Sequence, residues 1–359
     1  MTQRIEASAA ALTGQRPSYD FLVLIGRFQP PHRGHLALIE AALKRSQQLI
    51  VVCGSAAQPR SLRNPWSAAE REAMLLEALA PGDRERLHVV AVADVTYHEL
   101  TWVAAIQAAV ARVIAAQRPD GPPAAVGLIG TAGERLAHYG GLFPQWGVEA
   151  VEPCHGINGT AIRAALLQGC GDHEALSWLP PSVAQRLAAF GETAAGAALR
   201  ADWEKLQAFK ASWRAAPYPP VFVTVDAVVV QGGHVLLVER GHWPGCGLLA
   251  LPGGFVEQHE PLLEACLREL GEETLLQLPA ALLRASVRAA QVFDAPFRSA
   301  RGRTITHAFL IVLPPTRTLP VVEGGDDARR AAWLPLSELP RQRLFEDHYC
   351  IIQAMLRHV

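Results

Sequence analysis

Three glutamates in one short stretch could together hold a divalent cation. Glu269, Glu272 and Glu273 stand at positions i, i+3 and i+4 of a helical pattern, so their side chains share one face. Carboxylates at this spacing repel one another unless a cation lies among them, and hard ions such as Mg²⁺ prefer oxygen ligands. The opposite face carries an apolar stripe typical of a helix packed on a core, formed by Leu263, Cys266, Leu267 and Leu270. We predict a metal site here; for the glutamates alone, a solvated acidic helix is the alternative.

A second chemical centre is predicted where the first apolar segment ends. There the chain reads Gly26-Arg27-Phe28-Gln29-Pro30-Pro31-His32-Arg33-Gly34-His35 and leads into an amphipathic segment. His32 and His35 would lie at a helix N-terminus, where backbone N–H groups and the helix dipole attract anions and imidazoles add donors. Gly26 and Gly34 would let the backbone approach a ligand closely. The pattern indicates a phosphate site, although two loop histidines by themselves are more often incidental.

The elements around the two histidines alternate between strand and helix. Strand patterns occupy residues 21–26, 49–55, 87–94, 125–130 and 148–153, and helical patterns lie near 35–46, 67–79 and 101–117. This alternation predicts an α/β domain with a parallel sheet covered on both faces, whose ligands bind at the carboxyl ends of the strands.

The second half of the chain has a different strand pattern. Two β-rich runs flank the turn Gln231-Gly232-Gly233 and predict a hairpin, and further strand patterns lie at 307–314 and 331–336. From these shifts we expect a disordered tail at 1–18, a first domain at 19–190, a linker at 191–218 and a second domain at 219–359. The linker is expected to contain one helix, from Trp203 to Trp213.

Composition limits the classes of function. The 359 residues are half hydrophobic, which suffices for two cores, and the formal net charge of -1 gives no electrostatic case for nucleic acid or a membrane as partner. Six scattered cysteines predict neither a zinc site nor a disulfide framework. No apolar run approaches the ~20 residues of a membrane span, and the N-terminal stretch lacks a signal-peptide core. We expect a cytoplasmic enzyme and leave a homo-oligomer open.

The first half resembles a known family in three places. The Gly26–His35 string resembles the GxFxPxHxGH signature of the HxGH nucleotidyltransferases. Asn64-Pro65-Trp66-Ser67-Ala68-Ala69-Glu70-Arg71 resembles a segment of archaeal-type nicotinamide mononucleotide (NMN) adenylyltransferases. Ile157-Asn158-Gly159-Thr160-Ala161-Ile162-Arg163 is similar to their second signature, with Asn158 where Ser is usual. The resemblance implies a Rossmann-like, doubly wound parallel sheet.

This resemblance also implies a reaction and its residues. The 5′-phosphate of NMN would attack the α-phosphorus of ATP, giving NAD and pyrophosphate, so the protein need supply only positioning and charge stabilisation. His32, His35 and Arg163 are implied as the catalytic set. Substrate binding is implied for Gly26, Arg27, Phe28, Asn64, Arg71, Trp102 and Thr160. Trp102 would stack on nicotinamide, with a core tryptophan as the alternative, and Thr160 would cap its helix or contact phosphate.

The second half resembles the Nudix hydrolases in the spacing of Gly254, Glu260, Arg268 and the three glutamates. The resemblance implies an α/β/α sandwich with a mixed sheet. It also implies Mg²⁺, with Mn²⁺ as an alternative, held by Glu269, Glu272, Glu273 and the backbone carbonyl of Gly253. Glu273 would also be catalytic, and Glu260 and Arg268 would support the helix as an ion pair. Leu275 stands where the family has glycine, so we expect a different helix cap there. Glu323 is a candidate general base, with a solvated loop as the alternative.

Segments 294–306 and 345–349 resemble proteins that fuse both enzymes, hydrolysing ADP-ribose to AMP and ribose 5-phosphate in the Nudix half. Arg298, Arg301 and Arg303 are candidates to bind the substrate phosphates. The expected small-molecule partners are ATP, NMN and ADP-ribose. The alternatives are another nucleoside diphosphate derivative as substrate, or a Nudix half that only senses a ligand.

Overall fold

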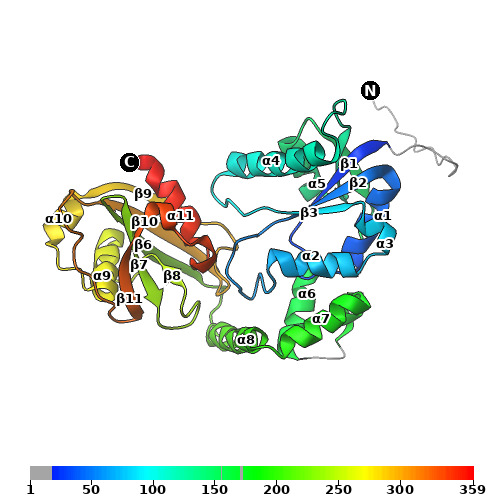
Figure 1. The fold of residues 1–359 in the computed structure, drawn as a ribbon. Coiled ribbons are helices and arrows are strands. Elements are labelled where there is room, and N and C mark those ends of the chain that lie inside the picture. The colour runs from blue at the N-terminus through cyan, green and yellow to red at the C-terminus, as the bar shows by residue number, and fades with distance from the viewer. Residues whose placement is uncertain (1–17, 155, 170–172) are drawn as a thin grey trace, which may run out of the picture.

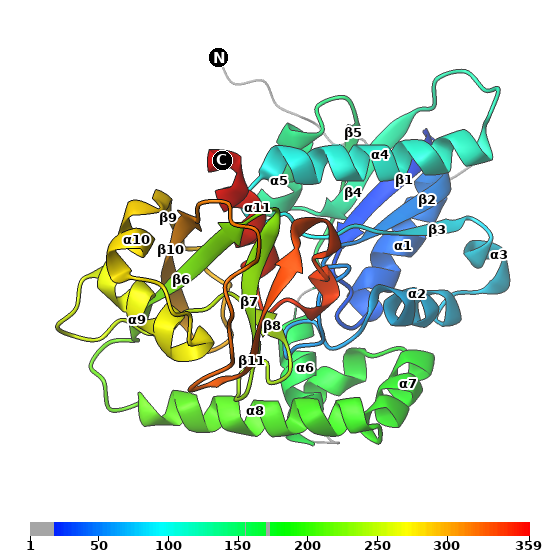
Figure 2. The same ribbon diagram turned by 60° about the vertical axis from the view of Figure 1, so that its left-hand side comes forward.

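The computed structural model describes residues 18–154, 156–169 and 173–359. They form two domains side by side, and helix α8 runs along both (Figures 1 and 2). The tail predicted at 1–18 lies, apart from Ser18, outside the described residues.

The first domain is built on a parallel sheet. Its strands are β1 (Tyr19–Gly26), β2 (Ser46–Cys53), β3 (Leu87–Ala91), β4 (Val126–Thr131) and β5 (Gly147–Val151), in the order β3-β2-β1-β4-β5. Every neighbouring pair is parallel. The strand order reverses between β1 and β4, which is where doubly wound sheets bind ligands. The predicted Rossmann-like sheet is confirmed.

Helices cover both faces of this sheet (Figure 1). They are α1 (Arg33–Arg45), α2 (Ala68–Glu77), α3 (Pro81–Arg84), α4 (Glu99–Gln117), α5 (Glu134–Leu142), α6 (Gly159–Gln168), the 3₁₀ helix η1 (Glu174–Trp178) and α7 (Pro181–Gly191). Side chains along a strand point alternately to its two faces. Leu22 and Leu24 of β1 therefore pack with α1 and α2, whereas Phe21 and Val23 pack with α4 and α5.

Helix α4 is long and apolar enough to cross a membrane by length and composition alone, which the inspection of the sequence did not anticipate. Its residues Val103, Ile106 and Val110 are buried with strand residues of the sheet. A core helix passes the same test of length and composition, so α4 is weak evidence for a membrane span.

The segment between the domains is mostly one helix, α8 (Ala194–Ser212). It begins well before the predicted Trp203 because Thr193 caps it by accepting a hydrogen bond from the Gly196 N–H at 3.1 Å. A Cβ at Gly196 would lie 2.3 Å from the Phe190 carbonyl oxygen, so the small residues let α8 approach α7 closely. The Gly- and Ala-rich composition from which we predicted a linker with one helix allows close helix packing here.

The second domain contains a mixed sheet. Its strands are β6 (Val221–Gln231), β7 (His234–Arg240), β8 (Leu249–Ala250), β9 (Val287–Phe293), β10 (Arg303–Val312) and β11 (Ala328–Pro335), in the order β11-β7-β6-β10-β9 with β8 beside β7. Only the pairing of β6 with β10 is parallel among these strands as described. The predicted hairpin is confirmed, with Gly232 and Gly233 at φ 55° and 76° in its turn.

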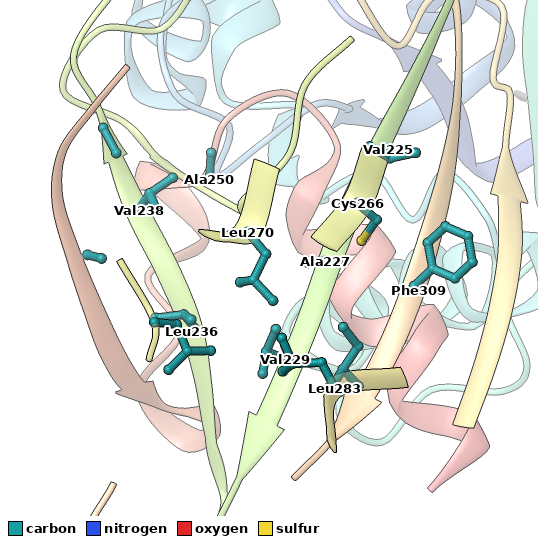
Figure 3. Close-up of a cluster of buried hydrophobic side chains, with 14 of the residues drawn as sticks. Val225, Ala227, Val229, Leu236, Val238, Ala250, Cys266, Leu270, Leu283 and Phe309 are labelled. Atoms are coloured by element: carbon teal, nitrogen blue, oxygen red, sulfur yellow. The ribbon is translucent and has the colours of Figure 1, made fainter. Parts of the chain in front are cut away.

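Helices lie on both faces of the mixed sheet. They are α9 (Leu262–Thr274), α10 (Ala280–Ala285) and α11 (His348–Met355), with the 3₁₀ helices η2 (Leu336–Glu338), η3 (Arg341–Arg343) and η4 (Leu356–His358). Figure 3 shows Cys266 and Leu270 of α9 over Val229 and Leu236 of the sheet. Ile351 of α11 is buried against the other face. The predicted sandwich is confirmed, and its packing fixes the glutamate face of α9.

Candidate active sites

A cavity of about 470 Å³ opens at the carboxyl ends of β1 and β4. Its lining includes Gly26, Arg27, Phe28, Gln29, His32, His35, Thr131, Arg135, Tyr139, Asn158, Thr160 and Arg163. The fold thus brings together two of the three predicted motifs of the first domain, Gly26–His35 and Ile157–Arg163, at the place where the strand order reverses.

His32 and His35 are held together at the start of α1. The backbone N–H of His32 donates to His35 Nδ1 at 3.3 Å, and the two rings stack with centroids 3.7 Å apart. Because Nδ1 of His35 accepts a hydrogen bond, a neutral His35 carries its proton on Nε2. Enclosure by protein lowers the pKa of His32 to about 4 and that of His35 well below its usual value. Both imidazoles are therefore neutral near pH 7 until an anion binds.

Several arginines converge on the same cavity. Arg163 is buried and donates to the Gln29 carbonyl at 2.6 Å and to Thr160 Oγ1 at 3.0 Å. Burial, and then the charges of Arg27 and Arg63, lower the pKa of Arg163 to about 10. Burial also lowers the pKa of Arg27, with Arg63 and Arg135 contributing in the same direction. Because these arginines repel one another, the binding of a polyanion such as a triphosphate among them is favourable.

Two predicted substrate-binding residues lie elsewhere. Arg71 is fully buried and donates to the carbonyls of Arg27 at 2.6 Å and Gly54 at 2.7 Å, so its charge holds loops together. Neither Arg71 nor Asn64 is among the described residues that line the cavity. The sequence could not distinguish Arg71 from a phosphate ligand because its partners are backbone oxygens.

Phe28 packs against His35 beside the cavity. Its ring is 1% exposed and lies 4.7 Å from the His35 ring, between centroids. A Cβ at Gly26 would lie 2.9 Å from this ring, so the glycine makes room for Phe28. Gly26 also lines the cavity, and its close approach to a ligand remains a prediction. Phe28 itself has φ 52°, a left-handed conformation that only strong packing maintains in a bulky residue.

Trp102 lies on α4 and is half-buried. It packs on Tyr139 and Phe143, with ring centroids 5.7 and 6.3 Å away. Tyr139 lines the cavity and Trp102 does not, so the predicted stacking on nicotinamide remains a prediction.

Sequence reasoning missed Arg135 and Tyr139 on α5. The sequence could have indicated them, because β4, like β1, is followed by a glycine-containing loop and then a helix. A strand followed by such a loop and a helix is typical of a ligand-binding edge in this type of sheet. The cap of α6 also differs from the predicted Thr160. Asn158 accepts a hydrogen bond from the Thr160 N–H at 2.9 Å, so Asn158 caps the helix. Thr160 is therefore free of the capping role and bonds Arg163.

The second site is formed by α9 and the preceding loop. Arg268 donates to Glu260 at 2.7 Å, so the predicted ion pair is present. The same guanidinium donates to Glu269 and Glu272, both at 2.9 Å. Glu273 accepts instead from the Gly253 N–H at 3.0 Å. Within the described ranges no three Asp, Glu, His or Cys side chains lie close enough together to hold a metal ion. Two of the three glutamates are instead paired with Arg268.

The donor set nevertheless fits a divalent cation. Burial and the charge of the nearby Glu269 raise the pKa of Glu273 to about 8, although the hydrogen bond from the Gly253 N–H opposes them. A Cβ at Gly254 would lie 2.5 Å from a Glu269 carboxylate oxygen, so both carboxylates lie against the 253–254 loop. Two carboxylates that each disfavour the other's charge gain from a hard cation between them.

The helix carrying these glutamates ends differently from our prediction. Leu275 itself takes the left-handed cap conformation, with φ 48°, although a leucine accepts it poorly. The loop that follows enforces it: the Glu323 N–H donates to the Thr274 carbonyl at 3.0 Å and the Gly325 N–H to that of Glu273 at 3.1 Å. These bonds satisfy carbonyls at the helix end. They also explain the position of Glu323, whose assignment as general base remains a prediction.

The three predicted phosphate-binding arginines differ in their contacts. Arg298 is buried and donates to both carboxylate oxygens of Asp347 at 2.9 Å. Arg303 is held by Asp294. Arg301 lies with its guanidinium carbon 5.1 Å from the centroid of the Phe255 ring. Arg298 and Arg303 each form a salt bridge with a carboxylate, whereas Arg301 donates to the Ser299 hydroxyl and interacts with the Glu346 charge without a salt bridge. Arg301 is therefore the best placed of the three for a substrate phosphate.

The fold and the two sites together define a nucleotide-handling α/β transferase joined to a hydrolase with an acidic cation site. Family models match accordingly: "Cytidylyltransferase-like" over residues 23–165 and "NUDIX domain" over residues 220–355. The chain belongs to the bifunctional NMN adenylyltransferase/ADP-ribose pyrophosphatase family. A protein of that description from Francisella tularensis, solved with AMP and a Mn ion, matches with a TM-score of 0.87 and 33% identity over 94% of this chain and 99% of its own.

Two curated relatives match one half each. The nicotinamide/nicotinic acid mononucleotide adenylyltransferase of Acinetobacter baylyi is 36% identical over 152 residues, 42% of this chain and 77% of the relative. The ADP-ribose pyrophosphatase of Methanocaldococcus jannaschii is 36% identical over 140 residues, 38% of this chain and 73% of the relative. The two matches support the same division of the chain into two enzymes.

Proposed function

We propose that this chain makes NAD from NMN and ATP in its first domain and hydrolyses ADP-ribose to AMP and ribose 5-phosphate in its second. The observation that carries the first activity is the convergence of a neutral histidine pair and several arginines on one cavity. The observation that carries the second is the pair of carboxylates beside the 253–254 loop, with Glu273 buried and Glu269 partly buried.

In the first reaction, a 5′-phosphate oxygen of NMN attacks the α-phosphorus of ATP, and the bond to the β-phosphate breaks to release pyrophosphate. The substrate supplies the nucleophile, so the protein contributes orientation and charge. His35 offers its Nε2–H, and Arg163 and Arg27 offer cationic donors to oxygens that gain charge in the transition state. Arg135 and Tyr139 line the same cavity. Arg135 adds a cation for an anionic substrate, and Tyr139 adds an aromatic ring.

In the second reaction, water attacks one phosphorus of the ADP-ribose diphosphate and loses a proton. The bond from that phosphorus to the bridging oxygen breaks, which releases AMP and ribose 5-phosphate. We propose Mg²⁺ as the cofactor, held by Glu269, Glu272 and Glu273, where it would act as a Lewis acid on the diphosphate. Glu269 and Glu272 each accept from Arg268 through one carboxylate oxygen, so the other oxygen of each could face the cation. Arg301, over the half-exposed Phe255 ring, binds a substrate phosphate.

One assay series tests the proposal as a whole. Wild-type protein with Mg²⁺ is given NMN and ATP, and separately ADP-ribose, NAD, NADH and diadenosine polyphosphates, with kcat/KM measured for each. We expect NAD formation, and ADP-ribose as the preferred substrate of hydrolysis. Preference for NAD or NADH would overturn the assigned hydrolysis and leave the cation site standing.

A further inference from the structure

The loop between β3 and α4 (residues 92–98) carries a tyrosine from the first domain into the second. The ring of Tyr97 packs edge-on against Phe293, with centroids 4.8 Å apart, and lies against the apolar cluster beneath α11. Its hydroxyl donates to Oδ2 of Asp347. Burial, and then the Asp347 charge, raise the pKa of Tyr97, so the hydroxyl keeps its proton and remains a donor.

Asp347 is also the partner of Arg298. Both carboxylate oxygens accept from this guanidinium at 2.9 Å, and the two side chains are only 7% and 3% exposed. Arg298 lies in turn 4.0 Å from Asp226, measured from Nη2 to Oδ2. A buried carboxylate needs its donors, so the Tyr97 hydroxyl fixes the orientation of Asp347 and, with it, that of Arg298.

The position of Asp347 also bears on Arg301. The preceding residue, Glu346, has φ 43°, a left-handed conformation that persists only where the neighbouring structure determines it. The Glu346 carboxyl interacts with Arg301 and with Ser299. If Asp347 lost its hydrogen-bond donors, the Glu346 backbone could leave its left-handed conformation and the Glu346 carboxyl would move. Arg301, the arginine best placed for a substrate phosphate, would then lose its carboxyl neighbour.

We infer that Tyr97, a residue of the adenylyltransferase domain, is a positioning residue for the Nudix site. It acts through Asp347 on Arg298 and, through Glu346, on Arg301. The inference rests on the proposed hydrolysis of ADP-ribose. It means that the Nudix half receives part of its substrate-binding geometry from the other domain.

The test is Tyr97→Phe in the full-length chain, which removes the hydroxyl and keeps the packed ring. Loss of one hydrogen bond to a buried carboxylate should raise KM for ADP-ribose roughly 10-fold and leave kcat within about 2-fold, because the α9 glutamates are untouched. NAD synthesis should keep its kcat and KM. The matched control is Tyr349→Phe at the same seam, whose ring lies under Arg341 at 4.6 Å and whose change leaves the Tyr97–Asp347 bond intact.

A double-mutant cycle gives an independent readout. In an Asp347→Ala background, which has no acceptor for the Tyr97 hydroxyl, adding Tyr97→Phe should change KM no further, since the hydroxyl acts through that carboxylate. An unchanged KM in Tyr97→Phe would overturn the inference, as would an equal loss of both activities together with thermal stability. Wild-type protein that fails to hydrolyse ADP-ribose would instead refute the proposed function.

Discussion

The stacked imidazoles of His32 and His35, with centroids 3.7 Å apart, are joined by a hydrogen bond from the His32 backbone to His35 Nδ1. The bond fixes the tautomer of His35 and directs its remaining N–H away from the helix backbone. The pair is thus a preformed, uncharged donor set at a helix N-terminus, ready for an anion.

The low pKa of His32 has a consequence for stability. Its folded pKa is about 4 against an ordinary 6.5, so between these values the unfolded chain binds more protons, and folding stability falls as pH decreases from 6.5 to 4. His32→Gln removes this contribution. Thermal unfolding measured from pH 7.5 to 4.5 should show a smaller loss of Tm in the variant. Parallel Tm curves for both proteins would contradict the lowered pKa.

Metal binding at α9 should be visible without turnover. Saturating Mg²⁺ at roughly 100 times its Kd should stabilise the second domain by about 3 kcal/mol and raise its Tm by several degrees. Glu273→Gln should abolish most of this shift. Glu264→Gln is the matched control on the same helix, because Glu264 pairs with Arg284, away from the ligand face. Equal Mg²⁺ shifts in all three proteins would place the cation elsewhere.

The left-handed cap at Leu275 predicts that glycine is better there. Leu275→Gly should raise the free energy of unfolding by about 1 kcal/mol, because glycine takes φ 48° without a Cβ clash. Leu275→Ala keeps the strain and loses side-chain packing, so it should not stabilise. Chemical denaturation followed at the second domain measures both. A destabilised Leu275→Gly would mean that the contacts of the leucine outweigh the strain.

Arg71 should be needed for stability and not for substrate affinity. Arg71→Lys cannot reach its several carbonyl partners at once and should cost about 2–3 kcal/mol of unfolding free energy. KM for ATP and NMN should stay near the wild-type value. A large rise in KM at unchanged stability would restore Arg71 as a substrate ligand.

Sequence reasoning worked where the functional residues are close in the chain. Glu269 and Glu273 are placed on one side by helix geometry, and His32 and His35 by the N-cap and first turn of α1, which spacing reveals. Arg71 and Arg298 were harder, because whether an arginine faces a ligand or a buried oxygen depends on packing between distant segments. The bond from Tyr97 to Asp347 joins residues from different domains and has no local signature. The start of α8 was missed because small residues are common to linkers and to tight helix contacts.

We propose that one chain carries out two reactions with separate catalytic residues at separate sites. The most direct measurement assays His35→Ala and Glu273→Gln, each for NAD synthesis and for ADP-ribose hydrolysis, beside wild-type protein. We expect His35→Ala to lose roughly 100-fold or more in NAD synthesis and to keep hydrolysis, and Glu273→Gln to show the reverse. If either variant, still folded, lost both activities to the same extent, the two-site account would be contradicted.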